Sequence, residues 1–96
     1  MKAYWIAHVD VADAEQYTQY TSRAPAAFAK FGGRFLARGG RSIALEGGPA
    51  RARNVVIEFD SYEQAVACYE SAEYQVARAH REGVAQAHII IVEGVV

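Results

Sequence analysis

The sequence predicts an α+β domain of the ferredoxin-like type, with the element order βαββαβ and an antiparallel sheet. Two runs rich in β-branched and aromatic residues, at residues 2–9 and 55–59, are each followed by a short polar turn and a helical pattern. Pairs of glycines in the middle of the chain indicate turns, and an apolar run lies near its end. Its 96 residues correspond to a single domain over residues 1–96.

The first half contains a strand at residues 2–9 and a helical stretch. Asp13, followed three residues later by Gln16, is a capping pattern that starts the helix. Pro25 lies inside the helical stretch and removes a backbone donor, so the helix should kink or restart there. The Gly32-Gly33 pair is expected to end it.

A hairpin is expected in the middle of the chain. The second strand is predicted at residues 34–38, with a bulge at Gly39-Gly40 and a continuation over residues 41–46. A turn at residues 47–49 then leads to the third strand. The first and third strands are expected to be central and parallel to each other, with the second and fourth at the edges.

The second half repeats the strand-then-helix arrangement. Ser61 with Gln64 forms a capping box. An apolar helical stripe follows at Tyr62, Ala65, Val66 and Tyr69. Ser71 offers a second N-cap, which predicts a break and a short second helix carrying Tyr74 and Ala77. Gly83 ends that helix, and the last strand is expected at residues 87–93.

Composition excludes several classes of protein. Hydrophobic content of 52%, charged content of 22% and a net charge of −1 argue against disorder and against counterion-driven nucleic-acid binding. No signal-peptide pattern follows Met1, and the terminal apolar run at residues 89–92 is too short to span a bilayer. Cys68 has no disulfide partner and is expected to be a reduced, buried thiol. These features predict a cytoplasmic protein with neither nucleic acid nor membrane as partner.

Both faces of the predicted sheet carry apolar residues. The first strand places Ala3, Trp5, Ala7 and Val9 on one face and Tyr4, Ile6 and His8 on the other. The last strand does not alternate over residues 89–92. Because the helices of one chain cover one face only, a second copy is expected to cover the other. The sequence therefore predicts an obligate homodimer, sheet against sheet, whose isolated monomers fold poorly.

Several segments carry a family resemblance. These are KAYWIAHVDVADAEQYTQY, GGRFLARGG, LEG, VVIEFDSYEQAVACYESAEYQVARAHR and IIIVEG. Together they resemble the domain-of-unknown-function 1330 family over essentially the whole chain. That family is similar to the dimeric α+β barrel superfamily, in which two ferredoxin-like sheets pack face to face with helices outside. The superfamily includes cofactor-independent monooxygenases, muconolactone isomerase-type enzymes and haem-using members. The resemblance implies fold and dimerisation, and it assigns no catalytic residues.

His8 is a candidate general base. It is expected near the C-terminal end of the first strand, beside the end of a parallel third strand, where Glu58 or Asp60 would orient it. The alternative is a partly buried histidine with a structural hydrogen bond. His80 and His88 have no metal-ligand spacing with a cysteine or carboxylate cluster, so neither a metal nor a cofactor is expected.

Glu58 interrupts the apolar run of the third strand, where a charge needs a partner. Arg34 and Arg38, on the neighbouring strand, are the expected partners. Such a pair would either anchor an anionic ligand or serve as a structural ion pair. Glu46 and Arg53 flank the predicted turn and are expected to form a cross-strand pair.

Four tyrosines, Tyr17, Tyr20, Tyr69 and Tyr74, are expected on helix faces turned toward the sheet. Aromatic residues at this spacing are typical of a core. The enzymes that share the expected fold keep their pocket between helices and sheet, so Tyr17 or Tyr74 is alternatively a cavity-lining residue by fold analogy.

Two functions follow as hypotheses. The first is a homodimeric α+β barrel that binds a small organic molecule in a pocket. The alternative is a cofactor-independent monooxygenase- or isomerase-like enzyme, in which His8, Glu58, Arg38 and a tyrosine transfer protons on a carbonyl or phenolic substrate. A weaker third hypothesis is an interaction module that uses an exposed sheet edge.

Overall fold

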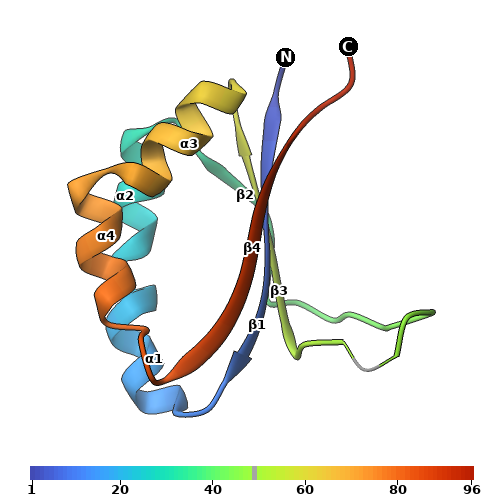
Figure 1. Cartoon of the computed structure of the whole chain (residues 1–96), viewed down its shortest axis with the longest axis vertical. Coiled ribbons are helices and arrows are strands. Elements are labelled where there is room, and N and C mark those ends of the chain that lie inside the picture. Colours follow the sequence, from blue (N-terminus) through green and yellow to red (C-terminus); the bar gives the residue numbers. More distant parts are fainter. Residues whose placement is uncertain (49) are drawn as a thin grey trace.

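A computed structural model describes residues 1–48 and 50–96 as one helical layer packed on one sheet (Figure 1). The elements are β1 (Ala3–Val11), α1 (Ala14–Thr21), α2 (Ala24–Lys30), β2 (Arg34–Arg38), β3 (Arg53–Phe59), α3 (Tyr62–Glu70), α4 (Ala72–Ala79) and β4 (Ala85–Glu93). The strand order is β2-β3-β1-β4, and all three pairings are antiparallel. The ferredoxin-like α+β prediction is confirmed.

The expected parallel pairing of the first and third strands is wrong. Ala3 of β1 lies opposite Phe59 of β3, and Val9 lies opposite Arg53, so the two strands run in opposite directions. The connections explain this direction. A helical crossover brings β2 back parallel to β1, and the following β2–β3 connection reverses the chain direction. The third strand therefore has to oppose the first.

The helices cover one face of the sheet, and the core lies between the two layers (Figure 1). Strand alternation decides which side chains enter it, because successive residues point to opposite faces. The large buried side chains on this inner face are Trp5, Ile57 and Phe59, with Tyr74 and Cys68 facing them from the helices. Odd-numbered residues of β1, β3 and β4 therefore face the helices, and even-numbered residues form an outer face that none of the described helices covers.

Helix boundaries follow the predicted caps. The side chains of Asp13, Ser61 and Ser71 each accept a hydrogen bond from the backbone N–H three residues later, at 3.0 to 3.1 Å. Ser71 ends α3 and begins α4, which confirms the predicted break. Pro25 occupies the first turn of α2, where its missing N–H costs nothing, so the helix restarts there.

The second strand ends earlier than predicted. No strand lies within the described part of residues 39–52, and the irregularity in β2 lies between Phe35 and Ala37. The Asp10 carboxylate explains the early end, since it accepts the Ala52 backbone N–H at 3.1 Å and the Arg51 guanidinium at 2.8 Å. The backbone N–H of Ala52 is therefore not available to form a strand-to-strand hydrogen bond with an extended β2.

The chain between β2 and β3 leaves the sheet as an arm, defined here as residues 39–48 and 50–52. It projects on the side away from the helices (Figure 1). The predicted turn at residues 47–49 lies here, with Gly47 and Gly48 at φ of +92° and +83°, while Pro49 is outside the described residues. Within the described part of the chain, no helix is long and apolar enough to cross a membrane.

Candidate functional site

A hollow lies between the helices and the inner face of the sheet. With its open mouth it measures about 460 Å³, but the centre of a water-sized sphere can occupy only about 40 Å³ of it. The enclosed part of the hollow is therefore narrow, with room for a few water-sized groups, and a larger ligand would also occupy the open mouth. Its walls are aliphatic and aromatic, and the charged side chains that line it are Arg38, Arg53 and Arg81. We call it the inner cavity.

Arg81 is the one charged residue in the described chain that is buried, with 9% of its surface exposed. It follows α4 and continues the inward stripe of Tyr74 and Ala77, at spacings of seven and four residues. Its Nη2 donates to the Tyr74 hydroxyl at 3.3 Å, and its guanidinium lies 5.2 Å from the centre of the Tyr20 ring. Its Nε is buried and has no hydrogen-bond partner among the described residues.

Arg53 enters the cavity from the sheet. As the first residue of β3, it lies opposite Val9 and points inward with the core residues of that strand. Its guanidinium is 5.9 Å from the centre of the Tyr17 ring, and its buried Nε also has no partner among the described residues. Gly39 makes room for it, because a Cβ there would come within 2.5 Å of Arg53 Nη1. The φ of +69° at Gly39 also favours glycine.

Arg38 lies at the edge of the inner cavity on β2. Its register partner is Val55, an inward residue, and its guanidinium packs 4.3 Å from the centre of the Phe35 ring. Unlike Arg81, it is exposed. It can therefore contribute positive charge at the cavity mouth without a large desolvation cost.

The inner cavity is positively charged and has no proton acceptor of the kind that general-base catalysis uses. Within the described chain, no Asp, Glu, His or Cys lines it. Burial raises the pKa of Tyr17, against the opposing charges of Arg53 and Arg81. Burial also raises the pKa of Tyr20, whose hydroxyl lies 2.8 Å from that of Tyr74. These phenols stay protonated at neutral pH, so the cavity offers hydrogen-bond donors and cations.

The predicted polar cluster of His8, Glu58 and Arg38 does not form. Because β3 runs antiparallel to β1, His8 lies beside Asn54 at the start of β3, with its Nδ1 2.6 Å from Asn54 Oδ1. Glu58 lies four residues further along β3, roughly 13 Å away at the usual rise of a strand. Arg38 is on the opposite face of the sheet. The expectation that Glu58 or Asp60 orients His8 is therefore wrong.

Glu58 pairs with one of its two expected partners. Arg34 Nη2 donates to Glu58 Oε1 at 2.7 Å, and the Tyr4 hydroxyl donates to Glu58 Oε2 at 3.2 Å. The hydrogen bond from Arg34 holds the pKa of Glu58 below its usual value. Arg34 also donates to Asp60 at 3.3 Å. This network lies on the outer face, so Arg34 does not reach the inner cavity.

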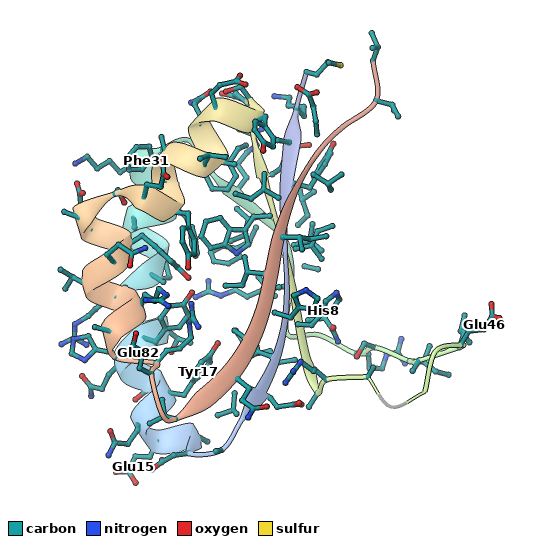
Figure 2. The ribbon with its side chains drawn as sticks, viewed as in Figure 1. His8, Glu15, Tyr17, Phe31, Glu46 and Glu82 are labelled. Carbon is teal, nitrogen blue, oxygen red and sulfur yellow. The ribbon has the colours of Figure 1, made fainter. Side chains whose placement is uncertain are left out.

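The remaining predicted residues also lie in different parts of the structure. Tyr17 lines the inner cavity. Tyr74 is fully buried, and it acts on the cavity through its hydrogen bonds to Tyr20 and Arg81. The expected Glu46–Arg53 pair is wrong, because Glu46 lies on the projecting arm while Arg53 points into the core (Figure 2).

Sequence reasoning missed Arg53 and Arg81 as cavity residues, although a pattern marks both. Arg53 has the same strand phase as Val55 and Ile57, and Arg81 continues the inward stripe of α4. The missing inference was that an arginine at a core-facing position, without an acidic partner at matching spacing, marks an internal polar site.

The family model described as a domain of unknown function (DUF1330) matches residues 2–95. The chain belongs to the DUF1330 family. Comparison of this DUF1330 chain with curated proteins gives no significant match.

Solved structures resemble the DUF1330 chain in fold. A protein of unknown function from Rhodopseudomonas palustris is 18% identical with a TM-score of 0.80, and the match covers 99% of this chain and 83% of that one. A cofactor-independent oxygenase, SnoaB of Streptomyces nogalater, is 10% identical with a TM-score of 0.66, covering 99% and 94%. A dimeric protein of unknown function with a ferredoxin-like fold, from Bacteroides fragilis, is 13% identical with a TM-score of 0.58, covering 97% and 96%. These likenesses establish the fold that the DUF1330 domain shares with dimeric proteins.

Proposed function

We propose that this DUF1330 domain binds a small organic molecule in its inner cavity, as a homodimeric α+β barrel in the cytoplasm. The observation that carries the proposal is the inner cavity itself, a narrow hollow with aromatic walls, three arginines and, among the described residues, no carboxylate, imidazole or thiol. Such a site can bind and orient a ligand, but the described residues supply none of the groups that most often serve as a general base. The free thiol of Cys68 fits a reducing compartment.

Fold analogy supports the alternative of a monooxygenase- or isomerase-like enzyme, because a cofactor-independent oxygenase shares the fold. Its proposed residues do not support it, since His8 and Glu58 lie on the outer face and Arg38 on the inner one. Binding without turnover is therefore the function that the geometry favours.

The outer face is proposed as the interface between two copies. Apolar residues form a row across its four strands, with Ala37 opposite Val56, Val56 opposite Ile6, and Ile6 opposite Ile90. Polar residues frame that row, and the arm projects beyond the same face (Figure 1). An apolar centre with a polar rim is the usual anatomy of a protein interface. Fold neighbours described as dimeric support this use of the face.

Trp5 provides a direct test of ligand binding, because it is the only tryptophan of the chain and it lines the inner cavity. Titration with the neutral arenes phenol and indole should change Trp5 fluorescence in a saturable way for at least one of them. Saturation-transfer NMR on the ligand would confirm binding independently of the absorbance of the arene.

Two phenylalanine substitutions on α2 locate the binding. Ala24 lines the inner cavity, and Ala24→Phe should fill it and remove the saturable change. Ala26 is exposed on the same helix, and Ala26→Phe should bind as the parent does. Circular dichroism would confirm that both variants are folded, since overpacking costs roughly 1–3 kcal/mol. Undiminished binding by Ala24→Phe, or no saturable binding by the parent, would contradict the proposal.

A further inference from the structure

We infer that the ligand of the inner cavity is a small carboxylate with a flat apolar body, whose charge is held by Arg53 and Arg81. The inference rests on the proposed binding function and specifies its chemical class. Its starting observation is a pair of buried guanidinium Nε atoms, one on each arginine, that have no hydrogen-bond partner in the described chain.

Burial without a partner is unusual for these groups. Buried polar atoms in proteins are almost always hydrogen-bonded, and a buried charge normally has a counter-charge. A guanidinium presents five N–H donors, and Arg81 uses one of them on Tyr74 at 3.3 Å. The cavity therefore presents donors and positive charge that nothing in the described protein neutralises.

None of the acidic residues of the described chain lines the inner cavity or forms an ion pair with Arg53 or Arg81. Those in ion pairs are Asp10 with Arg51, Glu58 with Arg34, Asp60 with Lys2 and Arg34, Glu73 with Lys30, and Glu82 with Arg78. Arg81 also borders a more open groove beside β4 that has Glu70 on its edge, but no ion pair forms between them. No acidic residue of the described chain therefore neutralises the cavity arginines, and a bound anion can supply their counter-charge.

The two arginines belong to one continuous row of side chains. Arg53 lies 5.9 Å from the centre of the Tyr17 ring, the Tyr17 and Tyr20 ring centres are 5.4 Å apart, and Arg81 lies 5.2 Å from that of Tyr20. An anion at this row meets cations together with phenol groups. A carboxylate suits them, because guanidinium donors match its two oxygens.

The walls determine the rest of the ligand. The hollow is narrow, and beyond the arginines it is lined by aromatic and aliphatic side chains that include Trp5 and Phe28. A flat ring fills such a space with good contact on both faces. A phosphate carries up to two negative charges and costs more to transfer into this apolar surrounding than a single charge does, so a monoanionic aromatic or similarly flat carboxylate is the better fit.

Three ligands of the same shape but different charge separate the effect of charge on affinity from the effect of shape. Benzoate, benzamide and benzamidine have nearly the same outline and carry negative, zero and positive charge. Titrations followed by Trp5 fluorescence at low ionic strength should show benzoate binding at least about 10-fold more tightly than benzamide, since hydrogen bonds to charged groups exceed neutral ones by about that factor. Benzamidine should bind most weakly.

Arginine variants assign the effect to the cavity. Arg81→Met and Arg53→Met keep an apolar stem, and each should weaken benzoate binding at least about 10-fold while changing benzamide binding little. Arg78→Met is the matched control, because it removes the same charge from the partly exposed Arg78, which is outside the inner cavity. Arg81→Met should also raise the thermal midpoint of the ligand-free protein, since it removes a buried unpaired charge.

The outcomes distinguish this inference from the proposed function. Benzamide binding as tightly as benzoate, or equal effects of the Arg78 and Arg81 substitutions, would overturn the carboxylate assignment and leave small-molecule binding intact. If no benzoate analogue binds while phenol or indole does, the assignment is overturned in the same way. If none of these compounds binds, the proposed function and this inference fail together.

Discussion

Cys68 illustrates how burial sets the chemistry of a single residue. It has no exposed surface, its Sγ donates to the Ala27 carbonyl oxygen at 3.7 Å, and burial raises the pKa of the thiol to about 12. The predicted buried, reduced thiol is confirmed in its burial. Because the thiolate is the reactive form, the group is inert in the folded protein.

The raised pKa predicts how stability depends on alkaline pH. The unfolded thiol loses its proton near pH 8.5, whereas the folded thiol keeps it to about pH 12. Between these values the folded state binds more protons, so the free energy of unfolding falls as pH rises, by at most about 1.4 kcal/mol per pH unit. In urea unfolding from pH 8 to 11, Cys68→Ala should lose stability less steeply than the parent. Parallel pH dependences would contradict the prediction.

Ser71 shows at the scale of an element how one side chain defines two helices. Its Oγ accepts from the Tyr74 backbone N–H at 3.1 Å at the start of α4 and donates to the Cys68 carbonyl at 2.6 Å at the end of α3. The sharp junction it creates lets α4 continue along the inner cavity to Arg81. The position of the cavity arginine thus depends on where α4 begins.

Ser71→Ala should lower the free energy of unfolding by about 1 kcal/mol, the usual cost of losing an N-cap. Ser71→Thr retains the hydroxyl and should cost less. Ser22→Ala is the control, because the exposed Ser22 hydroxyl donates only to the Gln19 carbonyl, at 3.3 Å. Urea unfolding at one fixed protein concentration measures all three. A Ser71→Ala protein as stable as Ser22→Ala would show that the cap contributes nothing.

The elements were predictable where local chemistry decides them. Caps at Asp13, Ser61 and Ser71 and the alternation of β1 depend on residues close in sequence, and the structure agrees with each. The end of β2 was not predictable in this way. It depends on the Asp10 carboxylate binding Ala52, a contact between residues 42 positions apart. Long-range contacts of this kind leave no local pattern.

The prediction of the candidate site around His8 was wrong for a related reason. The direction of β3 relative to β1 decides whether His8 lies beside Glu58 or Asn54, and an incorrect direction moved every predicted neighbour to the wrong end of the strand. The phase of β1 and β3 was correct, so the face of each of their residues could be inferred. In β2 the irregularity between Phe35 and Ala37 places Arg38 on the face opposite Arg34, which the sequence did not predict.

The whole molecule is thin, with extents of 33 × 33 × 17 Å, because one helical layer covers one face of the sheet. The buried side chains of Trp5, Val9, Ile57 and Phe59 all lie on the helix side of the sheet. The outer face instead presents Tyr4, Ile6, Val56, Ile90 and Val92, of which Ile90 and Val92 are 47% and 45% exposed.

Two further apolar side chains extend the same face. Ile43 and Leu45 of the arm are 80% and 83% exposed, on a segment that projects past the outer face (Figure 1). Apolar area removed from water contributes about 25 cal/mol per Å², against an association cost of roughly 4–15 kcal/mol. A sheet-to-sheet contact that also buries the two arms would remove more apolar area from water than the apolar row alone, and it is the contact we expect to exceed that cost.

Ile90→Lys should therefore convert the dimer to a monomer of lower thermal stability. A lysine here places an unpaired charge at the β4 end of the apolar row, beside Ile6 and inside the proposed interface, at a cost of roughly 3–5 kcal/mol, which weakens association by at least about 100-fold. Val76→Lys is the control, since Val76 is 61% exposed on α4, on the helix side of the molecule. Sedimentation velocity at micromolar concentration should show a dimer for the parent and Val76→Lys, and a monomer for Ile90→Lys.

The thermal midpoint of the parent should rise with protein concentration, as dissociation coupled to unfolding requires. A stable parent monomer whose midpoint does not depend on concentration would mean that the outer face meets water.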